Sequence, residues 1–169
     1  VHFLMTRFYC GMVGLLLGLG LIASPVIQAQ DHVSLNLAEI HVKGYPTEQA
    51  DEEFARLVGK YTDGALKVTV FSDGQIASDE KAAIEQVQSG ALAFTRVSTG
   101  SLGPFSARLT VFGLPYLFDS KEHMWSFLNS PYGQKMLGDL ASSRIVGLCW
   151  YDGGARSFYA RVPLRTLDD

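Results

Sequence analysis

The chain has 169 residues, of which 47% are hydrophobic, and a formal net charge of −3. Its basic residues are scattered, so the sequence offers no electrostatic patch for nucleic acid. No repeat or low-complexity tract interrupts it, and the 140 residues that follow position 29 suffice for one domain with a sizeable core.

The first 29 residues have the three parts of a secretory signal peptide. Arg7 precedes an apolar run at residues 11–23, and Ser24, Pro25 and the small residue Ala29 follow it. A membrane anchor is the alternative, but four glycines and Pro25 leave a short apolar stretch for a stable span. We therefore expect cleavage after Ala29 and export to the periplasm, with translation starting either ahead of Met5 or at it.

The two cysteines agree with export. Cys10 leaves with the signal peptide, so the mature chain keeps one thiol and forms no internal disulfide. Cys149 lies in the apolar segment 145–150, which we expect to be a strand. A buried, small hydrophobic role is therefore expected for Cys149 rather than that of a nucleophile.

Short apolar segments alternate with amphipathic helices along the mature chain. Strands are predicted at 33–40, 66–70, 91–94 and 145–151, and the segment 109–117 is largely apolar. Helices are predicted to start at the cap candidates Thr47, Ser78, Asp119 and Ser130. The first helix has an apolar face made of Ala50, Phe54, Leu57, Val58 and Tyr61. This order predicts an α/β fold with a largely parallel sheet covered on both faces.

Ligands of such sheets bind beyond the carboxyl ends of the strands. This rule selects four loops, at residues 41–46, 73–80, 96–101 and 152–156. Arg96 directly follows an apolar strand, so it can enter the site or turn outward. His41 has no cysteine or acidic partner in the sequence, which predicts no metal site, and we expect no cofactor.

Four segments resemble the solute receptors of tripartite ATP-independent periplasmic (TRAP) transporters, the DctP-like family. They are GQIASDEKAAIEQVQSGALAF at 74–94, VSTGSLGPF at 97–105, LPYLF at 114–118 and WYDGGARSFYARVPLRTLDD at 150–169. The resemblance covers about residues 35–169, and the segments follow the family's order and spacing.

The resemblance implies a type II periplasmic-binding-protein fold, in which two α/β lobes close over a small organic acid. Residues 30–152 would form the first lobe, nearly complete, and residues 153–169 the hinge and the start of a truncated second lobe. Members of the family are not enzymes. They would capture a carboxylate, such as a C4-dicarboxylate, and pass it to membrane permease subunits.

The resemblance also implies four ligand-binding residues. Arg156 matches the family's ligand-binding arginine, whose planar fork can donate two hydrogen bonds to a carboxylate. Glu80 matches a glutamate that lines the cleft in relatives, and Ser98 and Thr99 lie in a loop that supplies polar contacts. The alternatives are a surface arginine in a hinge, a glutamate that complements a helix dipole, and ordinary turn residues. The aromatic residues expected to pack at the hinge are Trp150, Tyr151 and Phe158.

The sequence departs from the family pattern at its end. Relatives continue with K-G-L-K-I-R-V, whose arginine makes the principal salt bridge to the ligand, whereas this sequence stops at Asp169. We expect a product of this length to be a fragment that binds its solute weakly or not at all, because a cleft needs both walls.

Two other functions are alternatives for an exported α/β chain. A hydrolase would need a G-x-S-x-G elbow, and the sequence contains none. A periplasmic sensory module that presents its ligand to a signalling partner uses the same fold and stays open. The arginine indicates a carboxylate ligand, but its identity is not encoded in these motifs.

Overall fold

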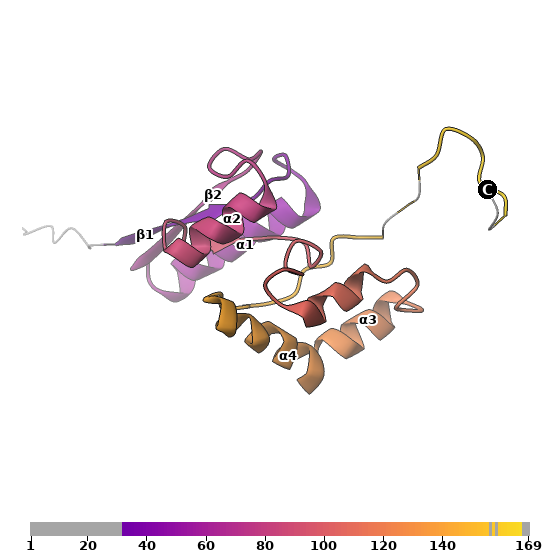
Figure 1. Ribbon diagram of the computed structural model, residues 1–169. Helices are drawn as coiled ribbons and strands as arrows, with labels where there is room; N and C mark the ends of the chain where they lie inside the picture. The colour runs from indigo at the N-terminus through magenta and orange to yellow at the C-terminus, as the bar shows by residue number, and fades with distance from the viewer. Residues whose placement is uncertain (1–31, 156, 158, 167–169) are drawn as a thin grey trace, which may run out of the picture. The chain divides into compact units, whose positions relative to one another are not determined.

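The computed structural model describes residues 32–155, 157 and 159–166, and Figure 1 follows them from indigo to yellow. The predicted signal peptide, Arg156 and Phe158 lie outside the described residues. The elements are β1 (Val33–Ala38), α1 (Pro46–Tyr61), β2 (Leu66–Phe71), α2 (Glu80–Ser89), β3 (Phe94–Thr95), α3 (Lys121–Leu128) and α4 (Pro131–Gly138), with 3₁₀ helices at Ala107–Gly113 and Asp139–Ser143.

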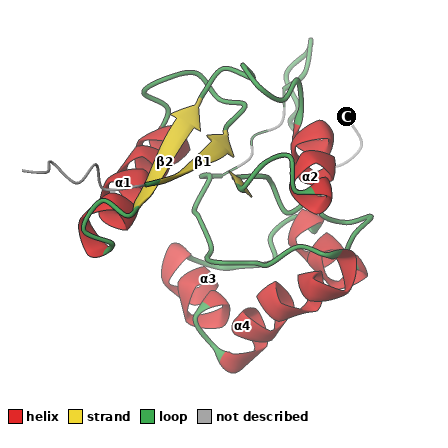
Figure 2. Ribbon diagram, turned by 90° about the vertical axis from the view of Figure 1, so that its left-hand side faces the viewer, coloured by secondary structure: helices red, strands yellow, loops and turns green. Residues whose placement is uncertain are grey.

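The three strands form a parallel sheet in the order β2-β1-β3. β1 pairs with β2 along its whole length, from Val33 opposite Leu66 to Ala38 opposite Phe71. The pairing with β3 is short and ends with Ala38 opposite Thr95. Parallel neighbours need helical crossovers, and α1 and α2 supply them. In Figure 2 the strands lie between these two helices, which confirms the predicted α/β class.

Several predicted boundaries hold. α2 ends at Gly90, whose φ of 78° is a left-handed conformation that glycine adopts without strain. α4 begins at the cap Ser130, with Pro131 in its first turn, as predicted. Three of the predicted caps are wrong. Asp79 rather than Ser78 caps α2, and Ser120 rather than Asp119 caps α3, because these side chains accept the free amides of Ala82 and His123.

The third wrong cap is Thr47, which lies inside α1 and is buried. Pro46 occupies the first turn of this helix and Tyr45 precedes it without a capping side chain. The buried residues of α1 are all polar and lie near its start: Thr47, Glu48 and Asp51. The predicted apolar face is only half-buried at Phe54, Leu57 and Val58, and Ala50 and Tyr61 are exposed. The start of α1 is therefore built around polar contacts instead of a hydrophobic core.

The hydrophobic core has two clusters that meet on α2. Ala83 belongs to a cluster made mainly of alanines, with Ala38 of β1, Ala77 and Leu92. Ile84 belongs to a larger cluster drawn from later segments, with Leu102, Leu109, Met136 and Leu140. Leu109 lies in the 3₁₀ helix Ala107–Gly113, where the apolar pattern alone did not specify a helix. Adjacent residues of α2 thus connect the sheet to α4 and its surroundings.

The predicted strand at 145–151 is not formed. The segment pairs with no strand among the described residues, so its amide groups have no ladder to join. Gly147 lies so close to Leu137 of α4 that an added Cβ would be 2.9 Å from the Leu137 carbonyl oxygen. Cys149 is exposed, which corrects the expectation of a buried residue. The segment therefore packs against α4 at Gly147 and does not extend the sheet.

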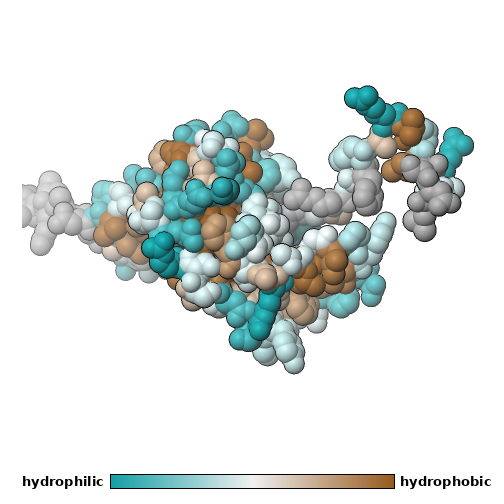
Figure 3. Space-filling model, in the orientation of Figure 1, coloured by the Kyte–Doolittle hydropathy of each residue, from teal (hydrophilic) through white to brown (hydrophobic). Residues whose placement is uncertain are grey.

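Residues 153–155, 157 and 159–166 form no helix or strand, and their side chains are exposed. Large apolar side chains reach the surface elsewhere too, and hydrophobic residues appear among hydrophilic ones in Figure 3. The most exposed include Tyr116, Tyr132 and Val146. Within the described part of the chain, no helix combines the length and the apolar character that crossing a membrane requires.

Candidate functional site

A buried ion pair joins the ends of two neighbouring strands. The register places Ala38 opposite Thr95, so the next residues, Glu39 and Arg96, leave the sheet side by side. The Arg96 Nε donates to Glu39 Oε2 at 2.7 Å, and its Nη2 donates to Oε1. This two-pronged geometry holds both groups in a fixed orientation.

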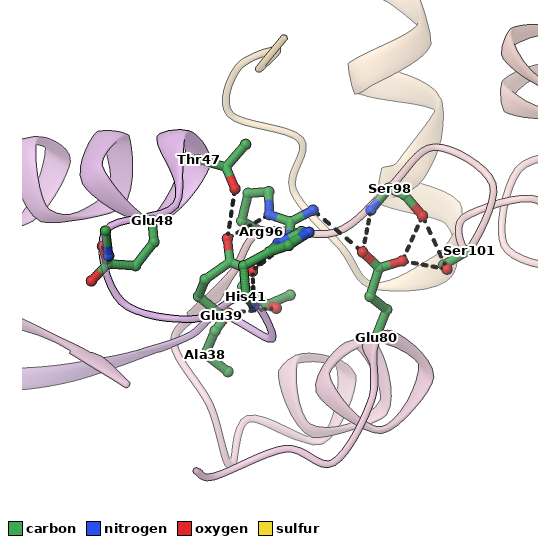
Figure 4. A network of polar contacts seen from close by, with 11 residues as sticks. Ala38, Glu39, His41, Thr47, Glu48, Glu80, Arg96, Ser98 and Ser101 are labelled. Atoms are coloured by element: carbon green, nitrogen blue, oxygen red, sulfur yellow. Dashed lines mark hydrogen bonds and ion pairs between the residues drawn. The ribbon is translucent and has the colours of Figure 1, made fainter. Parts of the chain in front are cut away.

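The Glu39 carboxylate has further donors. The His41 backbone N–H lies 2.9 Å from Oε1, and the Thr47 hydroxyl donates to Oε2 at 3.2 Å (Figure 4). The His41 Nδ1 lies 2.8 Å from Oε1. Burial alone would raise the pKa of Glu39, but the hydrogen bonds from Arg96 and His41 outweigh burial and lower this pKa to about 2. Glu39 is therefore an anion at neutral pH.

Arg96 also contacts Glu80 at the start of α2, with Nη1 3.3 Å from Oε1. The Ser98 amide donates to the same oxygen at 2.9 Å, and the hydroxyls of Ser98 and Ser101 donate to Oε2. Figure 4 shows both Glu80 oxygens occupied in this way. Burial opposes ionisation of Glu80, but these hydroxyls and Arg96 keep its pKa below the ordinary value. Glu80 thus fixes the loop that follows β3.

A cavity of about 440 Å³ lies beside this network. Its apolar lining, which we call its apolar end, includes residues such as Leu37, Ile84 and Leu137. Its polar lining residues, which we call its polar end, are His41, Tyr45, Thr47, Asp51, Thr95, Arg96, Ser98, Thr99, Tyr151 and Asp152. A pocket that combines apolar surface with polar groups is typical of a site for a small organic ligand.

Asp51 belongs to this end and has one oxygen without a hydrogen-bond partner among the described residues. Its side chain comes from α1, the residue is 1% exposed, and its Oδ2 has no hydrogen-bond partner among the described residues. Burial raises the pKa of Asp51 to about 7, with nearby Glu39 adding to the effect and the Tyr151 hydroxyl opposing it. Asp51 therefore exchanges its proton near neutral pH.

The four predicted ligand-binding residues differ in whether they line the cavity. Ser98 and Thr99 line the cavity. Glu80 is not among the lining residues, and its contacts suit a residue that positions Ser98. Arg156 lies outside the described residues. Their roles in ligand binding stay predictions.

Three of the four predicted loops contribute to the lining. Residues of 41–46, 96–101 and 152–154 do so, whereas residues 73–80 do not. Arg96 turns inward, toward Glu39 and Glu80. Of the aromatic residues, Trp150 packs edge-on against Phe112 with ring centroids 5.4 Å apart, and Tyr151 lines the cavity.

The sequence prediction missed Glu39 and Asp51. The signal for Glu39 was a charged residue directly after an apolar strand, the same signal that drew attention to Arg96. The signal for Asp51 was its spacing of four from Thr47, which places both on one face of α1. No group of three or more His, Cys, Asp or Glu side chains among the described residues is arranged to hold a metal ion.

Comparison with known proteins shows the family of the chain. The family model "Bacterial extracellular solute-binding protein, family 7" (DctP) matches residues 37–169. The chain belongs to this family. The chain is similar to a solute-binding protein of Chromohalobacter salexigens, which is 33% identical over 94% of this chain and 46% of its own length. It is also similar to the C4-dicarboxylate-binding periplasmic protein DctP of Rhodobacter capsulatus, which is 32% identical over 73% of this chain and 37% of its own length.

Solved structures agree with the family assignment. A TRAP periplasmic solute-binding protein of Xanthobacter autotrophicus, with bound β-D-galacturonate, is 41% identical with a TM-score of 0.74. Its counterpart from Pseudomonas putida F1, with bound D-glucuronate, is 36% identical with the same TM-score. The similarity covers 79% and 80% of this chain and 45% of each solved chain. The chain therefore spans less than half the length of these relatives, and its fold is part of a TRAP receptor fold.

Proposed function

We propose that the complete product of this gene is a periplasmic TRAP receptor that binds a sugar acid of the hexuronate class and delivers it to a membrane permease. The observation that carries the proposal is the pair of solved relatives, 41% and 36% identical, that hold galacturonate and glucuronate. A receptor of this kind binds its solute and performs no chemical step on it.

The polar end of the cavity supports a hydroxylated ligand. It presents the hydroxyls of Thr47, Thr95, Ser98 and Tyr151. The first three already donate within the chain, to Glu39, the Ala38 carbonyl and Glu80, so their oxygens can accept from a ligand hydroxyl. The apolar end supplies surface against which a sugar ring can pack. Such a mixture suits a ring with several hydroxyl groups and one acid group.

The charge at the site supports a separate arginine for the ligand carboxylate. Arg96 is already engaged by Glu39 and Glu80, so its charge is balanced within the chain. In the proposal Arg156, which lies outside the described residues, clamps the ligand carboxylate, and Ser98 and Thr99 contact the ligand beside it. The domain limits follow the same proposal: a signal peptide at 1–29, a first lobe at 30–152, and a hinge with the start of a second lobe at 153–169.

Calorimetry on the complete gene product tests the substrate class. D-galacturonate and D-glucuronate should bind at least about tenfold more tightly than succinate, which represents the C4-dicarboxylates named for the Rhodobacter relative. Tight binding of succinate with no binding of either hexuronate would refute the hexuronate assignment and favour a dicarboxylate receptor. A thermal-shift screen of other organic acids extends the comparison.

Arg156→Ala should weaken hexuronate binding on the order of 100-fold, because a bidentate charge-assisted contact is lost. Arg161→Ala is the matched control. Arg161 is exposed, and its substitution removes the same charge from the same segment. Equal effects of the two substitutions would contradict a specific role for Arg156.

Delivery to a permease is tested in cells. Deletion of the gene should abolish uptake of radiolabelled hexuronate, and restoring the gene should recover it. Unchanged uptake together with loss of a hexuronate-induced transcriptional response would support the sensory alternative instead.

A further inference from the structure

Asp51 is a buried carboxyl group in the lining of the cavity. The residue is 1% exposed and lines the polar end of the cavity, yet its Oδ2 has no hydrogen-bond partner among the described residues. A buried polar atom without a partner is costly, and nearly all such atoms in folded proteins find one. Because Asp51 lines the cavity, a ligand that binds there can supply the missing partner.

Other charges leave Asp51 without a cation of its own. Arg96 is the nearest described cation, and Glu39 and Glu80 already engage it. The remaining titratable groups around Asp51 are Glu39 and His41 after β1, Cys149 and Tyr151 in the segment beside α4, and Glu48 on its own helix. Burial and the Glu39 carboxylate raise the pKa of Asp51 to about 7, so a neutral carboxyl group is readily available.

A carboxyl group in this position can hydrogen-bond a ligand hydroxyl, and it repels a ligand carboxylate. A ligand hydroxyl can donate to Oδ2 when Asp51 is ionised and can accept from it when Asp51 is protonated. A second ligand carboxylate would instead meet the carboxyl groups of Asp51 and Glu39, and like charges in a buried site repel strongly. Discrimination of this kind excludes the wrong ligand as well as holding the right one.

We propose that Asp51 is a specificity-determining residue, which hydrogen-bonds a hydroxyl group of a sugar acid and disfavours ligands that carry a second carboxylate. The inference rests on the proposed function, because it assigns a residue to the choice between a hexuronate and a dicarboxylate. It adds a contact from α1 to those expected from the loops after the strands.

The test compares D-galacturonate with succinate on the complete gene product by calorimetry. Asp51→Ala should lower galacturonate affinity by about tenfold or more and leave succinate affinity unchanged or higher, because one hydrogen bond and one repulsive group are removed. Asp51→Asn keeps a donor and an acceptor and should retain galacturonate affinity within a few-fold. Glu52→Gln is the control, since Glu52 is an exposed neighbour on the same helix.

The pH dependence of galacturonate affinity provides a second test, which does not require Asp51→Ala to fold. Wild-type affinity for galacturonate should fall as the pH rises through about 7, because an ionised Asp51 repels the ligand's acid group. Asp51→Asn should flatten this dependence, and any part that persists then belongs to His41 or another group. An identical pH profile in both proteins overturns the inference.

The outcomes separate the two proposals. If the wild type binds galacturonate and Asp51→Ala changes both ligands equally, Asp51 has a structural role only and the inference fails while the proposed function stands. If the wild type binds succinate and no sugar acid, the proposed function fails and the inference fails with it.

Discussion

Arg96 and Glu39, which are 57 positions apart in the sequence, form a two-pronged ion pair. Neither side chain has much contact with solvent: the Glu39 side chain is fully buried and that of Arg96 is 12% exposed. The pair joins the end of β1 to the end of β3, and through Glu80 it reaches the start of α2. It therefore fixes the polar end of the cavity.

Arg96→Met should destabilise the protein by about 3–5 kcal/mol, because Glu39 would keep a buried charge without its partner. Urea denaturation measures the loss. Arg108→Met is the control, since the Arg108–Asp139 pair is largely exposed and should contribute less than about 1 kcal/mol. Adding Glu39→Gln to Arg96→Met should recover part of the stability, and similar small losses for the Arg96 and Arg108 variants would contradict the assigned importance of the buried pair.

The Glu39 carboxylate should make the fold sensitive to acid. Its pKa is about 2 in the folded protein against an ordinary 4.5, so its contribution is complete above pH 4.5 and is lost as the pH falls toward 2. The difference corresponds to about 3 kcal/mol. In urea titrations over this range, Glu39→Gln should show a weaker pH dependence than the wild type, whereas the exposed Glu52→Gln should follow the wild type.

Asp51 should act in the opposite direction. Its pKa is about 7 in the folded protein against an ordinary 3.8, so its contribution to stability is fully present below 3.8 and is lost as the pH rises through 7. In the ligand-free protein, Asp51→Asn should remove this loss of stability with rising pH. Urea midpoints measured from pH 4 to above 7 check the sign, and a wild-type stability that rises across this window while that of Asp51→Asn does not would contradict it.

The cap of α3 distinguishes two neighbouring residues. Ser120→Ala should cost about 1 kcal/mol, because the Ser120 hydroxyl oxygen accepts the His123 amide at 3.1 Å. Asp119→Ala should have little effect, since the Asp119 side chain is 94% exposed and does not cap the helix. Chemical denaturation of both variants decides between them, and a larger loss for Asp119→Ala would restore the capping-box prediction.

Two glycines of α4 should respond oppositely to alanine. A Cβ at Gly133 would lie 2.3 Å from the Leu128 carbonyl oxygen, so Gly133→Ala forces α3 and α4 apart and should cost about 1–3 kcal/mol. Gly138 has open space around it and a helical φ of −64°, so Gly138→Ala should be neutral or stabilise by up to about 1 kcal/mol. Melting temperatures of the two variants measure the contrast, and equal shifts would show that the approach at Gly133 is not tight.

Local patterns in the sequence predicted most elements of the fold. The alternation at 66–70, the inward positions Ala83 and Ile84 and the stop at Gly90 match the structure because each depends on a few adjacent residues. The caps of α2 and α3 were misplaced by one residue, since neighbouring polar side chains compete and the backbone angles decide which one reaches the free amides. The strand at 145–151 failed because a strand requires a paired neighbour, which apolar residues alone do not supply.

The α/β class and the membership in the solute-receptor family could be predicted from the amino-acid sequence, because both depend on short segments in a fixed order. Which polar residues meet depends on the tertiary structure. The parallel register that sets Ala38 against Thr95 brings Glu39 beside Arg96, and the packing of α1 buries Asp51 next to them. Such contacts depend on how distant segments align, and no local pattern encodes that alignment.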